Sequence, residues 1–381
     1  MPIDTTVRPG DLRTEEMLIN MGPQHPSTHG VLRLEITTDG EVVTDARPFM
    51  GYLHRAFEKH CEKVGYTGVI PYTDRMDYLA SMNNNHGYVM VVEKLMGLEV
   101  PERAEYIRVI MAELNRIASH LVAFGTFGND LGAVTPLVWG FRDREPILDI
   151  FEKACGARLT YNYYRIGGVS GDLTDEMLDD IRRFLDYFEP KLKEYDDLLS
   201  YNKIFIERTA GVGVIPLEMA INYGLTGPQL RGSGMRWDLR KDEPYSIYDQ
   251  LAFDVPVGKG LKGEIGDSWD RYMVRMWEMA ESAKILRQCV ERIPAGDYIN
   301  PKTPKNIKAP KGEAFVRVEN PRGELGYYLV SDGKTSPYRL KVRSPCFVNL
   351  GVVPAISDGV MIADLVAILG SIDIVLGEID R

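Results

Sequence analysis

The sequence predicts an α+β protein in which a central bundle of long helices is flanked by small antiparallel sheets. Three observations support this fold class: alternating runs joined by an Asp-Gly turn near the start, long stretches with helical periodicity in the middle, and three strand-like runs near the end. The chain has 381 residues, of which 44% are hydrophobic and 26% charged. This composition provides enough apolar side chains for a large buried core.

Residues 1–50 are expected to form an N-terminal β region. After a short polar arm, residues 31–37 and 41–47 alternate between apolar and polar side chains. The two runs are separated by Asp39 and Gly40, a dipeptide typical of hairpin turns. A small antiparallel sheet therefore opens the predicted fold.

Residues 51–300 are expected to form the helical bundle. In residues 102–124 apolar side chains recur every three or four positions, which predicts a long core helix. The same period over residues 175–200 predicts a second helix, with Pro190 expected to kink it, and residues 268–293 predict a third. Residues 210–266, rich in glycine, proline and aromatics, show no sustained period and are interpreted as an irregular segment packed on the bundle.

Residues 301–381 are expected to form a C-terminal β region and a final helix. A linker rich in proline and lysine precedes strand-like runs at residues 314–319, 326–331 and 338–343. An apolar helix is predicted over residues 358–371. The chain is then expected to end in a tight polar tail, residues 377–381.

Composition excludes several classes of function. The net charge of -10 argues against nucleic acid as a partner, because phosphate binding needs a surplus of Lys and Arg. The N-terminus shows no secretory signal, and no apolar run approaches the roughly 20 residues of a membrane-spanning helix, so membrane contact is expected only through partner subunits. The four cysteines are widely separated and form no Cys-x-x-Cys pair, which argues against a disulfide framework, structural zinc or an iron–sulfur cluster.

Two histidines, His25 and His29, stand in a loop punctuated by proline and glycine just before the first predicted strand. Such loops often present side chains into a cleft. A metal site is one interpretation, but no cysteine or carboxylate lies nearby in sequence to complete it. The alternative is that the histidines simply hold the loop by hydrogen bonds.

Polar residues also interrupt an apolar run at Arg75, Asp77 and Tyr78, and a core helix runs into glycines before Asp130. Buried polar groups need partners or a ligand. Structural alternatives are open for each: a local ion pair between Arg75 and Asp77, a core aromatic with a bonded hydroxyl for Tyr78, and a helix cap for Asp130.

A resemblance to a known family extends these interpretations. Over nearly the whole chain, and in order, the sequence contains the segments GPQHPSTHGVLR, GYLHRAFEK, PYTDRMDYLA, RIASHL, DLGAVTP, RIGGV, GLTGPQLRGSG, RWDLR, GELGYYLVSDG and LGSIDIVLGEIDR. In these segments it resembles the D subunit of NADH-quinone oxidoreductases, the quinone-site subunit of respiratory complex I. That family is in turn similar to the large subunit of nickel-iron hydrogenases, which implies the same hydrogenase-like fold.

The resemblance also shows what the chain has lost. In hydrogenases two paired-cysteine segments ligate nickel, and the four thiol positions correspond here to Asp77, Ala80, Val375 and Glu378. Because a nickel-iron centre needs soft thiolate ligands, these residues argue against the alternative of a membrane-bound hydrogenase. The cavity is therefore expected to hold another ligand, and no metal or cluster is expected in this chain.

For that ligand the resemblance implies a quinone head group, either menaquinone or ubiquinone. His29 and Tyr78 resemble its hydrogen-bond donors, with Asp130 as the partner of His29 and His25 in the same loop. Arg75 resembles the residue that lies against the terminal iron–sulfur cluster of a partner subunit. Reduction of a quinone develops negative charge on its carbonyl oxygens, and a histidine and a phenol are suitable proton donors there.

One position departs from the family pattern. Where many members carry a histidine thought to titrate with the cluster, this sequence has Thr160. The substitution predicts a cluster potential without that pH dependence, which favours a low-potential acceptor such as menaquinone.

The resemblance further implies a setting. The expected function is electron transfer to quinone coupled to proton translocation, on the cytoplasmic face of the bacterial inner membrane. The implied partners in complex I are the B subunit with its iron–sulfur cluster, the C and I subunits, and the H subunit in the membrane, with NAD bound elsewhere in the complex. A ferredoxin-driven quinone oxidoreductase of the same family remains an alternative, and so does a non-catalytic scaffold, although the joint presence of His29, Tyr78 and Asp130 argues against a scaffold.

Overall fold

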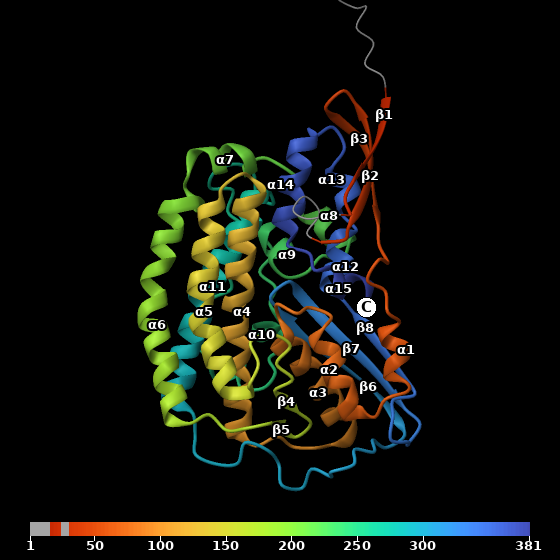
Figure 1. Cartoon of the computed structure of the whole chain (residues 1–381), viewed down its shortest axis with the longest axis vertical. Helices are drawn as coiled ribbons and strands as arrows, with labels where there is room; N and C mark the ends of the chain where they lie inside the picture. Colours follow the sequence, from red (N-terminus) through yellow and green to blue (C-terminus); the bar gives the residue numbers. More distant parts are fainter. Residues whose placement is uncertain (1–15, 24–29) are drawn as a thin grey trace, which may run out of the picture.

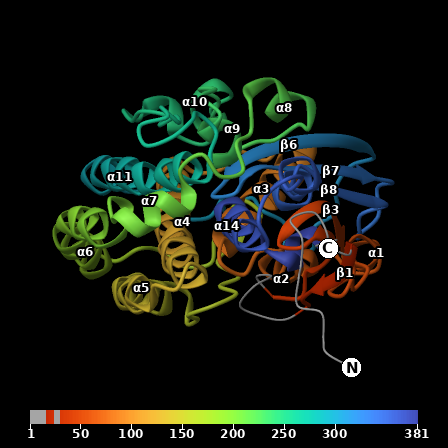
Figure 2. The same ribbon diagram turned by 90° about the horizontal axis from the view of Figure 1, so that it is seen from above.

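The long helices and the small sheets occupy opposite sides of the molecule. The computed structural model describes residues 16–23 and 30–381. In Figure 1 the long helices stand together on one side and two sheets lie on the other, and the view from above in Figure 2 shows the same separation. The predicted α+β fold class is confirmed. His25 and His29 lie outside the described residues.

The central helix is α4 (Glu102–Asp130), which includes the predicted run of residues 102–124 and extends to Asp130. Its side chains are buried on almost every face because α5 (Val134–Cys155), α11 (Ser268–Arg292) and α14 (Ile362–Ile372) pack around it. Such a helix is the core of a bundle rather than an amphipathic surface element.

The other bundle helices begin at side-chain caps. Helix α6 (Asp175–Tyr195) starts where the Thr174 hydroxyl accepts a hydrogen bond from Met177 N, and α11 starts where Asp267 accepts one from Asp270 N. Pro190 lies inside α6, and the predicted helix continues to residue 200 as a π-helical turn, η1 (Asp196–Ser200).

The first sheet contains three antiparallel strands, β1 (Glu16–Met21), β2 (Arg33–Asp39) and β3 (Val42–Phe49). Strands β2 and β3 are the predicted hairpin. Strand β1 falls in the segment expected to be a polar arm, and that expectation is wrong for these residues. Its pairing with β2 across residues 24–29 is a contact that local periodicity does not reveal.

Short helices connect this sheet to the bundle. They are α1 (Phe57–Cys61) and α2 (Tyr66–Asp74), and the longer helix α3 (Ser81–Met96) follows them. The region from residue 164 to 250 holds further short elements: β4 (Tyr164–Arg165), β5 (Gly168–Val169), α7 (Lys203–Thr209), α8 (Leu217–Asn222), α9 (Pro228–Gly232), α10 (Leu239–Asp242) and η2 (Tyr248–Gln250). The predicted irregular segment thus contains short helices separated by loops.

The second sheet follows α11 and is antiparallel in the order β6 (Gly312–Asn320), β7 (Gly323–Ser331) and β8 (Arg339–Arg343). All three strands were predicted. After it come α12 (Pro345–Leu350), α13 (Val353–Ile356), α14 and α15 (Leu376–Asp380). The tail was expected to be polar and tight, but α15 is a helix whose residues Leu376, Glu378 and Ile379 are buried.

Charged side chains are buried inside the bundle, where they pair with one another. Arg231 binds Glu278 at 2.7 Å and Glu319 at 2.8 Å, and Glu278 also lies 2.9 Å from His120 Nε2. Burial lowers the pKa of His120, so this imidazole is neutral at physiological pH. Every ionic group of this cluster is at most 2% exposed, so removal of one partner would leave a buried charge uncompensated.

Candidate functional site

Tyr78 lies in a short turn between α2 and α3 that α4 holds from behind. Asn115 of α4 donates to Leu79 O at 2.8 Å and accepts a hydrogen bond from Met82 N at 2.9 Å. Ser81 Oγ donates to Tyr78 O at 3.3 Å. The turn backbone is therefore anchored to the core, while the Tyr78 side chain is 44% exposed, so Tyr78 is not a core aromatic.

The neighbouring Asp77 is fully buried and pairs with an arginine distant in sequence. Arg322 Nη1 donates to Asp77 Oδ2 at 2.7 Å, and Arg322 Nη2 donates to Asp373 Oδ1 at 3.2 Å. The expected alternative of a local ion pair with Arg75 is wrong, because Asp77 turns inward whereas Arg75 is exposed and donates to Pro71 O at 2.6 Å.

The Tyr78 phenol is a proton donor at neutral pH. Partial burial raises its pKa, the nearby charge of Asp77 raises it further, and Arg322 opposes this effect. A phenol whose pKa lies above 10 keeps its proton until a base or a developing negative charge takes it.

Arg75 borders a cavity of about 590 Å³ on the surface of the protein. The residues around it include Arg55, His60, Tyr72, Arg75, Met76 and Arg381. Three arginines at one opening, with an aromatic ring between them, favour a negatively charged or electron-rich neighbour.

The C-terminal helix α15 lies directly against the segment that carries Arg75. A Cβ atom on Gly377 would lie 2.7 Å from Met76 O and 3.0 Å from Arg75 O, so only glycine allows this approach. Asp380 then accepts hydrogen bonds from Gly51 N at 2.8 Å and Leu53 N at 2.7 Å. Helix α15 therefore contacts the backbone of Leu53, Arg75 and Met76, three residues that line the cavity.

The two segments expected from the resemblance to match the nickel-binding segments of hydrogenases meet in the structure. Arg322 joins Asp77 to Asp373, and Gly377 packs on the backbone of Met76. Between them Glu378 Oε2 accepts a hydrogen bond from Cys346 N at 3.2 Å. Among the described residues no group of three or more His, Cys, Asp or Glu side chains has the arrangement of a metal site.

Glu378 provides a pH-dependent prediction. Burial and the charge of Asp77 raise its pKa from 4.5 to about 7. Between these pH values the folded protein keeps a proton that the unfolded chain releases, so the free energy of unfolding falls as pH rises through this window. We expect Glu378→Gln to remove that fall, measured as the unfolding midpoint of the purified complex near pH 4.5 and near pH 7. If the unfolding midpoint of parent and variant depends on pH in the same way, Glu378 does not have the raised pKa.

Asp130 is the last residue of α4 and is half-buried. A Cβ atom on Gly370 of α14 would lie 3.5 Å from its Oδ2, which places Asp130 against that helix. It does not cap the next helix, because the N-cap of α5 is Ala133. Asn115, which holds the Tyr78 turn, lies about 22 Å further back along α4 at about 1.5 Å per residue.

Among the described residues, Arg75 and Tyr78 share the connection between α2 and α3, and Asp130 is the last residue of α4. The segment with His25 and His29 lies outside the described residues. Arg322 and Asp373 lie against the Tyr78 turn through Asp77, a contact that the sequence did not predict. The only local signal was an arginine within the turn between Asn320 and Gly323, a position where a charge is ordinarily solvated.

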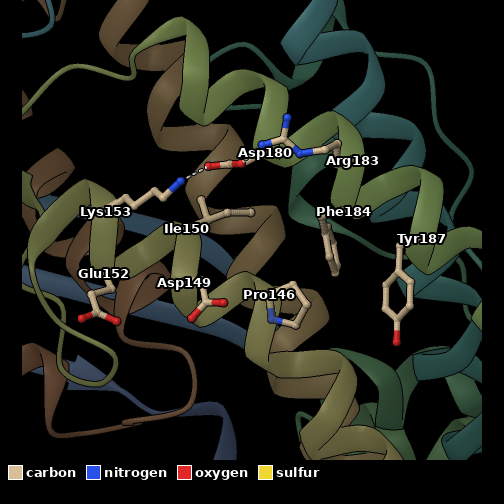
Figure 3. Close-up of a pocket in the computed structure, with 9 residues that line it drawn as sticks. All are labelled: Pro146, Asp149, Ile150, Glu152, Lys153, Asp180, Arg183, Phe184 and Tyr187. Atoms are coloured by element: carbon tan, nitrogen blue, oxygen red, sulfur yellow. Dashed lines mark hydrogen bonds and ion pairs between the residues drawn. The ribbon is translucent and has the colours of Figure 1, made fainter.

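A second cavity of about 610 Å³ lies between α5 and α6, as Figure 3 shows. Lys153 of α5 points to Asp180 of α6 at 2.6 Å, and Asp180 also pairs with Arg183. These charged groups already satisfy one another at the surface, and we assign no site here.

Comparison with known proteins identifies the family. The family model described as "Respiratory-chain NADH dehydrogenase, 49 Kd subunit" matches residues 130–306 and 301–381. Proteins named as the D subunit of NADH-quinone oxidoreductase are 57% identical over 97% of this chain in Pelodictyon phaeoclathratiforme, Chlorobium luteolum and Chlorobaculum tepidum. The alignment covers 94%, 95% and 94% of these relatives, respectively.

The structure is thus a helical bundle with small antiparallel sheets, in which a buried arginine joins two cysteine-free segments. The chain belongs to the family of the 49 kDa subunit of respiratory-chain NADH dehydrogenase. Residues 16–23 and 30–381 include no helix that is both long and apolar enough to cross a membrane.

Proposed function

We propose that this chain is the subunit of NADH-quinone oxidoreductase that binds the quinone head group and delivers protons to it. The observation that carries the proposal is the Tyr78 turn. It presents an accessible, protonated phenol on a backbone held by Asn115 and Asp77. Arg75 and Met76, which precede this turn in the chain, line a cavity with several arginines. A donor held in this way loses little orientational freedom when the substrate binds.

Quinone reduction adds two electrons and two protons, and negative charge develops on the carbonyl oxygens during the reaction. In the proposed site Tyr78 and His29 donate the two protons. Asp130 pairs with His29, holds it in one tautomer and stabilises its protonated form. Proton loss from His29 then leaves the Asp130 charge uncompensated, and this change is the proposed trigger for proton translocation.

The electrons come from a neighbouring polypeptide of the complex. We propose that Arg75 lies against the terminal iron–sulfur cluster of the B subunit, where its charge stabilises the reduced cluster and raises its potential. The supporting observation is that Arg75 is exposed beside Arg55 and Arg381 at one opening, a charge distribution that suits an electron-rich partner.

Family membership supports a proposal for the wider assembly. The proposed neighbours besides the cluster-bearing protein are the C and I subunits and the H subunit in the membrane, with NAD bound elsewhere in the complex. The proposed place is the cytoplasmic face of the inner membrane, where the quinone, menaquinone or ubiquinone, enters through the membrane-embedded neighbour. Thr160 favours menaquinone, because it replaces the histidine expected to make the cluster potential depend on pH.

The proposal is tested on membranes whose complex carries His29→Ala or Asp130→Asn. We expect each substitution to lower quinone reduction by about 100-fold, the usual contribution of a general acid or its partner. Reduction of an artificial acceptor by the upstream electron path should be unchanged, which also controls for assembly. Parental quinone reduction in both variants would refute the assignment of this pair.

A further inference from the structure

Arg322 is a buried residue that the proposed chemistry does not yet use. It follows Asn320 and Pro321 in the tight turn between β6 and β7, and its side chain is 1% exposed. Its backbone is held on both sides: Asn320 Oδ1 accepts from Arg322 N at 3.1 Å, and Asn349 Nδ2 donates to Arg322 O at 3.1 Å. The guanidinium therefore extends from a rigid base.

The guanidinium joins three elements that are far apart in sequence. Nη1 donates to Asp77 Oδ2 at 2.7 Å and to Ser119 Oγ of α4 at 3.0 Å. Nε donates to Asp373 O at 2.9 Å, and Nη2 donates to Asp373 Oδ1 at 3.2 Å. A planar group with five donors in a fixed fork is suited to holding these four acceptor atoms of three residues at once, whereas an ammonium group, with three donors, is not.

Arg322 acts on Tyr78 through Asp77, the residue that directly precedes Tyr78 in the chain. Asp77 uses one carboxylate oxygen for Arg322 and the other to accept from Leu79 N at 3.1 Å, so the carboxylate spans the backbone of Tyr78. The backbone on either side of Tyr78 is thus tied through Asp77 to the guanidinium, and its direction depends on that tie.

We propose that Arg322 is a positioning residue for quinone reduction, which holds Asp77 so that the adjoining Tyr78 phenol points at the quinone oxygen. This inference rests on the proposed function of Tyr78. It makes the turn between β6 and β7 part of the quinone site, although Arg322 itself is buried behind the reacting groups.

The charge of Arg322 also supports Tyr78 as a proton donor. Asp77 and Asp373 both raise the pKa of Tyr78, and Arg322 is the cation that opposes them. Without Arg322, Asp77 would lose its cation and Asp373 would keep only Arg275, at 3.6 Å, so the two buried carboxylates would act more strongly on the phenol and would repel each other. Either effect weakens Tyr78 as a proton donor.

The test compares Arg322→Gln, Tyr78→Phe and the double variant in the assembled complex. We expect Arg322→Gln to lower kcat for quinone reduction at least about tenfold, because misplacement by about 1 Å costs on the order of 100-fold, with upstream activity per assembled complex unchanged. If Arg322 acts through Tyr78, the double variant is no slower than Tyr78→Phe alone.

The matched control is Arg240→Gln, which removes another fully buried arginine, whose ion pairs are with Asp238 and Glu113 and not with the Tyr78 turn. It should reduce the amount of complex but leave the ratio of quinone reduction to upstream activity at the parental value. Arg322→Lys, which keeps the charge but not the fork, should recover part of the activity.

Several outcomes overturn the inference. One is a parental rate of quinone reduction in Arg322→Gln. Another is that the losses caused by Arg322→Gln and Tyr78→Phe multiply in the double variant. A third is that the ratio of quinone reduction to upstream activity falls equally in the Arg240→Gln control. If Arg322→Gln does not assemble, Asp77→Asn tests the same tie and should lower kcat in the same selective way. Should Tyr78→Phe alone retain parental activity, the proposed function fails; should only the Arg322 prediction fail, the proposed function stands.

Discussion

Tyr78→Phe should abolish nearly all quinone reduction while the protein still folds and assembles. Phenylalanine keeps the ring and removes only the hydroxyl, which carries the proton that we assign to the quinone. General acid catalysis contributes about 100-fold to 10,000-fold, so the loss is expected in that range. The measurement is NADH-dependent quinone reduction by membranes, beside reduction of an artificial acceptor that reports the upstream path.

A second tyrosine of similar exposure provides the control. Tyr223, at the end of α8, is 43% exposed, against 44% for Tyr78. Tyr223→Phe should leave quinone reduction at the parental rate. Loss of upstream activity together with quinone reduction in Tyr78→Phe would show a defect of assembly instead of a defect of the site.

Arg231→Met should have the largest effect on stability. The substitution keeps much of the side-chain volume but leaves Glu278 and Glu319 buried without the cation that joins them. Removal of one member of a buried ion pair costs about 3–5 kcal/mol, a large part of the stability of a typical domain. We expect little assembled complex at the normal growth temperature, measured as the amount of this protein in membranes.

The comparison for Arg231 is a solvent-exposed ion pair. Arg183 pairs with Asp180 on the surface of α6, where its side chain is 68% exposed. Arg183→Met should cost less than about 1 kcal/mol and leave the amount of complex unchanged. Equal amounts of complex in the Arg231 and Arg183 variants would contradict the role assigned to the buried cluster.

The elements predicted best are those with a sequence signal of their own. The helical period of α4 and α11 and the alternation of β2 and β3 are local patterns, and the structure confirms them. The ends of these elements are less local. Helix α4 continues through Gly125 and Gly128, where glycine allows α5 to pack closely against it. A Cβ atom at Gly125 would lie 2.8 Å from the Cα atom of Leu137 in α5.

What could not be predicted from the sequence depends on contacts between distant residues. Strand β1 exists because β2 pairs with it, and α15 is buried because its tail packs on Met76 and binds Gly51 and Leu53. Composition suggests a polar arm and a polar tail in both cases. A short segment takes its structure from its neighbours when its own propensity is weak.

Some parts of the candidate site were predicted from the sequence, and others were seen only in the structure. The residues Arg75, Tyr78 and Asp130 were found through the family resemblance, since taken alone each had an ordinary structural explanation. The partner of Asp77 was not found, because nothing in a single sequence links it to Arg322, 245 positions later. Buried ion pairs between distant segments are visible only in three dimensions.

Binding of the quinone head group to this chain is tested most directly by photolabelling. The assembled complex is labelled with a quinone that carries a photoreactive group on its head ring. We predict that the label appears in the peptide containing Tyr78, that excess quinone prevents it, and that Tyr223→Phe does not change it. Quinone-protected labelling that falls entirely on other parts of the complex would contradict the assignment of the quinone site to this chain.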